Sequence, residues 1–156
     1  MESDKILKDL LKVYIAQTES ALQISEIISN HGSEDGITPD SFVTGLIYRL
    51  MVPMDENNMK ECLKIAENIF NETSSDDEYC DSDEYCDSDE YCDSDEYDDS
   101  EIIFSRVIKR NNCNCEICEK ARVCLINYKF FEPDNTLSKK FQESINNALS
   151  MHKLNI

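Results

Sequence analysis

An acidic six-residue repeat near the middle of the chain most constrains how it can fold. The unit Cys-Asp-Ser-Asp-Glu-Tyr occurs three times without a break, over residues 80–97. A period of six matches neither the roughly 3.6 residues per turn of an α-helix nor the 3.5 or so of a coiled coil, and like charges at close spacing repel. We therefore expect residues 72–100 to form a disordered acidic loop outside any packed core.

The negative charge of the chain is concentrated in this tract. Between Ser75 and Glu101 there are 15 acidic and no basic residues, whereas the other 129 residues carry 18 acidic and 15 basic ones. Binding to phosphate groups by general basicity needs clustered lysine and arginine, and an anionic membrane surface would repel the tract. We therefore expect neither direct nucleic-acid binding nor membrane binding.

The segments on both sides of the tract show helical spacing of apolar residues, and only three Gly and three Pro interrupt them. This pattern predicts an all-α protein, a small bundle of five or six helices interrupted by the acidic loop. We expect an N-terminal helical region over 1–71, and a cysteine-containing helical region over 101–156 that packs on it. The apolar face expected for the first helix consists of Leu7, Leu10, Leu11, Tyr14, Ala21, Ile24 and Ile28.

Several residues are typical of helix ends. Pro39 follows Thr38 as the first residue of a helix, and Gly32 follows a helix end where a left-handed residue is often needed. The expected N-caps are Ser3, Thr38, Asp55 and Thr136. The segment 101–110 is ambiguous because its β-branched residues favour a strand. We predict a helix there, since no partner strand is visible elsewhere in the sequence.

Four cysteines within twelve residues form the most specific local motif. Cys113, Cys115, Cys118 and Cys124 are candidate ligands of a tetrahedral zinc site. Cys124 also fits the apolar face of a helix over 116–130, where a free cysteine acts as a small hydrophobe. Reduced, packed cysteines and a redox or disulfide role are the alternatives. Substitute ligands would be Cys62, His31 or His152, although nothing in the sequence places them nearby.

The chain lacks the sequence features of an enzyme or of an exported protein. It contains no Gly-rich phosphate loop and no nucleophile elbow, so we expect no catalytic residues. The acidic start is not followed by an apolar segment, which favours a cytoplasmic location and reduced thiols.

The acidic tract suggests a binding function. Its carboxylates and tyrosines are suited to a basic protein surface, with cation–π contacts adding to Coulomb attraction. The expected partner-binding residues are Asp83, Glu84, Tyr85, Asp89, Glu90, Tyr91, Asp95, Glu96 and Tyr97. Ser75 precedes three acidic residues and is a candidate phosphorylation site. The alternative is an inert spacer expanded by repeat slippage.

Two segments, Thr38–Met54 and Cys113–Cys118, resemble uncharacterised proteins of large nucleocytoplasmic DNA viruses of the mimivirus sort. The resemblance implies a cytoplasmic or virion-associated protein without established catalytic residues. Together, these features predict a non-enzymatic interaction or adaptor protein whose acidic tract contacts a basic partner. The alternative is a small zinc-stabilised structural protein with an inert spacer.

Overall fold

Five α-helices and one very short pair of strands make up the part of the chain that the structure describes, residues 1–74 and 105–156 of a computed structural model. This confirms the predicted all-α fold class. The helices are α1 (Glu2–His31), α2 (Pro39–Met51), α3 (Glu56–Ser74), α4 (Glu116–Asn127) and α5 (Thr136–Met151). A single 3₁₀ turn (Tyr128–Phe130) extends α4. No helix in these two ranges combines the length and the hydropathy needed to span a membrane.

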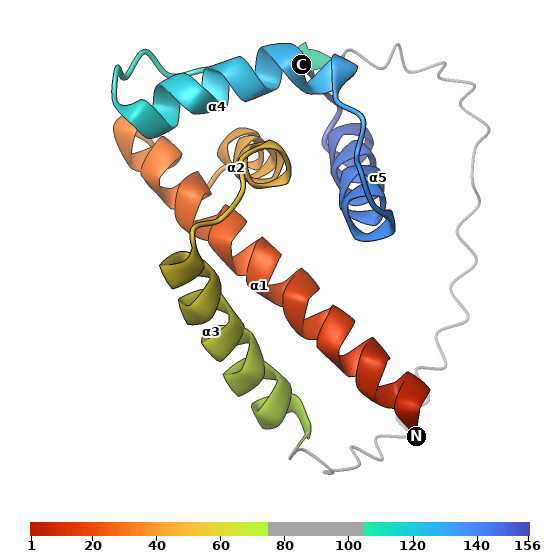
Figure 1. The fold of residues 1–156 in the computed structure, drawn as a ribbon. Coiled ribbons are helices and arrows are strands. Elements are labelled where there is room, and N and C mark those ends of the chain that lie inside the picture. Colours follow the sequence, from red (N-terminus) through yellow and green to blue (C-terminus); the bar gives the residue numbers. More distant parts are fainter. Residues whose placement is uncertain (75–104) are drawn as a thin grey trace, which may run out of the picture.

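Helix α2 lies at the centre, with α1, α4 and α5 around it (Figure 1). Ten of its thirteen residues are buried. Ile47 of α2 lies in the main hydrophobic core together with Leu125 of α4 and Ile145 of α5. Each of these three residues is at most 2 % exposed. The main core therefore contains residues from both sides of the acidic tract. A second, smaller core of Ala16, Cys62 and Ala66 joins α1 to α3.

Glycine and small polar residues let α1 and α2 approach each other closely. A Cβ atom placed on Gly45 would lie 2.1 Å from Ser25 Oγ and 2.5 Å from the carbonyl oxygen of Ala21. One turn away, Ser29 Oγ donates to Ser41 Oγ at 2.7 Å. This close approach fixes the position of the C-terminal end of α1, including His31, relative to α2.

The helix ends confirm two of the predicted caps and correct two others. Thr38 and Ser41 form a reciprocal capping box at the start of α2, and Asp55 Oδ1 accepts from the backbone N–H of Asn58 at 2.8 Å. Helix α5 is capped by Asn135 instead of Thr136, because the Asn135 side chain reaches the N–H of Ser138. Helix α1 begins at Glu2, so Ser3 already lies inside it and no side chain caps its start.

The predicted helix over 101–110 is wrong in its described part. Arg106–Val107 form strand β1, which pairs in parallel with strand β2 (Leu154–Asn155) at the other end of the C-terminal region. The N–H of Ile108 donates to the carbonyl oxygen of Asn155 at 2.8 Å. Each strand is two residues long, too short for a periodic signal, which is why the sequence showed no partner strand.

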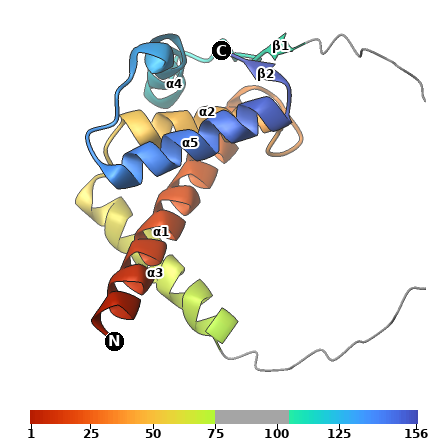
Figure 2. The ribbon, with the colours of Figure 1, turned by 90° about the vertical axis from the view of Figure 1, so that its right-hand side faces the viewer.

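The expected apolar face of α1 is covered only from Tyr14 onwards. Ile24 is buried, whereas Leu7, Leu10 and Leu11 are 44 to 58 % exposed. The N-terminal turns of α1 extend beyond α2, α4 and α5 (Figure 2). Spacing correctly identified residues that share a face, but it contained no information on where the neighbouring helices end.

Candidate metal centre

Two segments far apart in the sequence meet at one corner of the bundle. His31 is the last residue of α1, and the N–H of the following Gly32 donates to the carbonyl oxygens of Ile28 and Ser29. The chain then turns at Ser33, which has a left-handed φ of 57°. The sequence predicted this conformation for Gly32, but the φ of Gly32 is −89°. The segment that joins β1 to α4 passes over this helix end.

His31 lies within contact distance of three cysteine sulfurs. Its Nδ1 atom is 3.2 Å from Cys115 Sγ, 3.4 Å from Cys113 Sγ and 3.5 Å from Cys118 Sγ. All four donor atoms lie within 4.8 Å of one another. In tetrahedral zinc coordination, bond lengths of about 2.0 Å to nitrogen and 2.3 Å to sulfur place these two atoms about 3.5 Å apart. The histidine–cysteine distances therefore fit a Cys₃His metal site.

The local backbone directs hydrogen bonds at the sulfurs. Cys115 is the N-cap of α4, and its Sγ accepts from the backbone N–H of Cys118 at 3.4 Å. In the same way, the N–H of Cys115 donates to Cys113 Sγ at 3.4 Å. Donors aimed at a sulfur stabilise its thiolate form, which is the form that binds metals. With the Cys-x-Cys-x-x-Cys spacing, two of the three sulfurs thus accept hydrogen bonds from backbone N–H groups.

The proton affinities of two neighbouring thiols differ strongly. The backbone N–H of Cys118 is the main cause that lowers the pKa of the Cys115 thiol to about 6. Burial is the main cause that raises the pKa of the Cys118 thiol to about 11. Cys115 therefore releases its proton more readily than Cys118, and a metal ion must displace the proton of Cys118.

Asn111 and Arg122 hold the loop of residues 108–115, here called the cysteine loop, against α1 and α4. Asn111 Nδ2 lies 3.0 Å from the carbonyl oxygen of Ile28 and 3.3 Å from Cys118 Sγ, so one amide group bridges α1 and a candidate ligand. Arg122 Nη1 donates to the carbonyl oxygens of Asn111 at 2.9 Å and of Cys113 at 2.7 Å. Such supporting contacts orient the ligands of metal sites.

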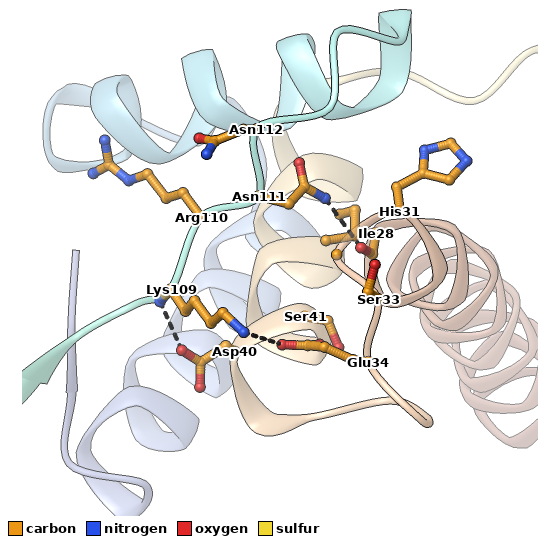
Figure 3. A pocket seen from close by; sticks show the side chains of 11 residues that line it. Ile28, His31, Ser33, Glu34, Asp40, Ser41, Lys109, Arg110, Asn111 and Asn112 are labelled. Carbon is orange, nitrogen blue, oxygen red and sulfur yellow. Dashed lines mark hydrogen bonds and ion pairs between the residues drawn. The ribbon is translucent and has the colours of Figure 1, made fainter.

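A cavity of about 220 Å³ borders the same loop (Figure 3). On its wall, the N–H of Lys109 donates to Asp40 at 2.7 Å and its ammonium pairs with Glu34 at 3.6 Å. Figure 3 shows His31 at the rim, with its ring turned away from the Asp40–Lys109 contact. Lys109 thus contacts the carboxylates of both Asp40 and Glu34, and these contacts anchor the loop beside the cysteines.

Three of the four cysteines expected to bind a metal come together, and the fourth does not. Cys124 is buried in the main core. It follows Cys118 by six residues on α4, which separates the two by about 9 Å along the helix axis. Of the substitutes considered, Cys62 lies in the second core and His152 is the exposed C-cap of α5. His31 is the substitute that lies beside the three cysteines.

The expected partner-binding residues from Asp83 to Tyr97 and Ser75 lie outside the part of the chain that the structure describes. Comparison with protein-family models, with curated proteins and with solved structures gives no match. The resemblance to viral proteins therefore stays a prediction.

Proposed function

We propose that this chain is a non-enzymatic helical protein stabilised by a structural zinc ion, with His31, Cys113, Cys115 and Cys118 as ligands. The observation that carries the proposal is the set of three distances, 3.2 to 3.5 Å, between His31 Nδ1 and the cysteine sulfurs. Zinc prefers this mixture of thiolate and imidazole ligands. Such an ion would cross-link the end of α1 to the start of α4.

The number of ligands favours a structural role over a catalytic one. A catalytic zinc ion keeps a position for water or substrate, whereas a structural one is enclosed by four protein ligands. Three thiolates and one neutral imidazole would leave the complex with a net charge of −1, and Arg122 next to the loop would offset it. The proposal thus agrees with the expected absence of catalytic residues.

The first test is the metal content of protein purified without chelators. We expect about one zinc ion per chain by elemental analysis, and the loss of this ion in His31→Ala, Cys113→Ser and Cys118→Ser. Cys124→Ser is the matched control, because this cysteine belongs to the same sequence motif but lies in the main core. Loss of zinc in Cys124→Ser with retention in His31→Ala would contradict the ligand set.

Spectroscopy of the cobalt-substituted protein provides an independent test. Cobalt(II) occupies tetrahedral zinc sites, and its absorption reports both the geometry and the number of thiolate ligands. We expect a tetrahedral spectrum with thiolate charge-transfer bands that are lost in Cys113→Ser and persist in Cys124→Ser. An octahedral spectrum would exclude a Cys₃His site.

A redox role is the competing hypothesis for the same cysteines. Cys115 and Cys118 form a Cys-x-x-Cys pair at the start of α4, an arrangement that also occurs in thiol–disulfide exchange proteins. In that case, protein isolated in air would contain a Cys115–Cys118 disulfide and no zinc. Mass spectrometry of the intact, non-reduced protein distinguishes the two hypotheses by the mass of the metal ion or the loss of two hydrogens.

The adaptor function of the acidic tract stays a separate prediction. We expect a basic protein partner whose binding weakens as the salt concentration rises. The experiment is a pull-down with the full chain and with a variant that lacks residues 75–100. An unchanged set of partners with unchanged salt sensitivity would leave the tract as an inert spacer.

A further inference from the structure

One arginine is buried without a carboxylate partner. The Arg49 residue is only 7 % exposed, and no acidic group in the described ranges forms an ion pair with it. Its Nε–H group is buried and has no hydrogen-bond acceptor. An uncompensated buried charge is costly, so native proteins normally pair it or use it to bind a ligand.

The contacts that Arg49 does make leave this charge unbalanced. Nη1 donates to the carbonyl oxygen of Val52 at 3.1 Å, near the C-terminal end of α2, and the guanidinium carbon lies 5.5 Å from the centre of the Tyr48 ring. Both partners are neutral. Burial is the main cause that lowers the pKa of Arg49, and the nearby carboxylate of Asp55 opposes this shift without cancelling it.

Arg49 lines a cavity of about 380 Å³ between α1, α2, α4 and the start of α3. The polar part of its lining includes Tyr48, whose hydroxyl makes no hydrogen bond within the described residues, and Lys120 at the surface. The acidic lining residue is Asp55, which is occupied as the cap of α3. The two cations therefore outnumber the single carboxylate in this cavity.

Ser20, Gln23 and Asn58 complete the polar lining, and the apolar lining comes from several elements. It includes Ile24 and Ile27 of α1, Ile117 of α4, and Val52 and Pro53 after α2. A volume of this size exceeds what a bare inorganic anion fills and lies within the range of pockets for small organic ligands. Cationic groups next to apolar side chains suit a ligand with both characters.

We propose that this cavity binds a small organic oxyanion, a carboxylate or a phosphate monoester, with its charged group at Arg49 and Lys120 and its apolar part against Ile24, Ile27 and Ile117. The guanidinium of Arg49 then donates to the oxyanion, and the ligand supplies the missing counter-charge beside the buried Nε–H group. The Lys120 ammonium, which pairs with Glu116 at 2.6 Å, retains further N–H donors for the same group.

The test is a titration of the ¹⁵N-labelled full chain with phenyl phosphate, benzoate, inorganic phosphate and phenol. The side-chain Nε–H signal of Arg49, assigned by its absence in Arg49→Lys, reports on the guanidinium group. We expect a saturable shift of this signal with phenyl phosphate or benzoate, and the stronger of the two identifies the oxyanion. Phenol lacks the charge and is expected to leave the signal unchanged.

Variants separate binding from folding. We expect Arg49→Lys to weaken binding by about tenfold and Lys120→Gln by about threefold, because charge-assisted hydrogen bonds are lost. Lys120 is surface-exposed, so its substitution leaves the fold intact, and exposed Lys139→Gln is the matched control. An Nε–H signal that no anion shifts at millimolar concentration would overturn the proposal. Equal affinities for phenyl phosphate and inorganic phosphate would overturn the proposed contact between the apolar part of the ligand and the isoleucines.

Discussion

Asp40 carries the most concentrated set of charged contacts at the scale of single residues. It accepts from Arg106 at 2.5 and 2.7 Å and from the N–H of Lys109 at 2.7 Å, and only 5 % of it is exposed. These bonds connect the first turn of α2 to β1 and to the cysteine loop that follows it. Asp40 thus holds in place the segment that carries Cys113 and Cys115 and leads into α4, which carries Cys118.

We expect the ion pair at Asp40 to make stability depend on pH. The hydrogen bond from Arg106 is the main cause that lowers the pKa of Asp40. Its contribution is therefore complete above the unfolded-state pKa, about 4, and is lost as the pH falls through the lower folded-state value. Because the Arg106 side chain is 59 % exposed, we expect Asp40→Asn to cost only about 1–2 kcal/mol at pH 7.

Urea unfolding at pH 7 and below pH 3 measures this effect. The difference between wild type and Asp40→Asn should shrink at the acidic pH. Glu143→Gln is the control, because its pair with Lys140 lies at the surface and should contribute little. A cost for Asp40→Asn that is equal at both pH values would contradict the electrostatic explanation.

Asn111 does not belong to the proposed ligands, but it contacts one of them directly. We expect Asn111→Ala to lower the affinity for zinc by about tenfold, because it removes both the donor to Cys118 Sγ and the bond to α1. Competition with a chromophoric chelator measures the change. Asn112→Ala, at the exposed neighbouring position, should bind zinc like the wild type, and equal losses in both variants would assign no special role to Asn111.

At the scale of elements, the close approach of α1 and α2 at Gly45 is the most sensitive contact. The added methyl group of Gly45→Ala would meet the backbone oxygen of Ala21, which cannot move aside without shifting α1. We expect a net destabilisation of about 1–3 kcal/mol, despite the higher helix propensity of alanine. Urea unfolding measures it, with Gly36→Ala as the control, since nothing lies within 4 Å of that site.

The elements differ in how far local sequence determined them. Helices α2, α4 and α5 follow from apolar spacing and from caps such as Thr38, because these signals act within a few residues. The pairing of Val107 with Asn155 depends on contacts across the whole C-terminal region, so no local pattern predicts it. The exposure of Leu10 likewise depends on where other helices end.

The part of the candidate site that depends on local sequence was predictable, and the part that depends on contacts between distant segments was not. The spacing of Cys113, Cys115 and Cys118 indicated metal ligands, since a loop followed by a helix start brings such residues together locally. Cys124 was added on proximity in sequence, but six residues of helix carry it away from the other sulfurs. His31 lies 82 residues before Cys113, and only the packing of α1 against α2 and α4 brings it to the site.

At the scale of the whole molecule, the proposed zinc ion links the regions on the two sides of the acidic tract. Because a metal that binds only the folded state stabilises it, we expect zinc at 1,000 times its dissociation constant to add about 4 kcal/mol. Differential scanning calorimetry with and without chelator measures the effect. The shift should persist in Cys124→Ser and vanish in Cys113→Ser, and a melting temperature insensitive to chelator would argue against the ion.

The division of the ligands between α1 and the C-terminal region has a practical consequence. A protease cut between residues 75 and 104 would leave one fragment with the imidazole and another with the three thiols, while Ile47 and Leu125 would still belong to one interior. Neither fragment alone would have a complete coordination sphere. Recombining separately produced halves, with and without the ion, would therefore turn metal uptake into a readout of fragment complementation.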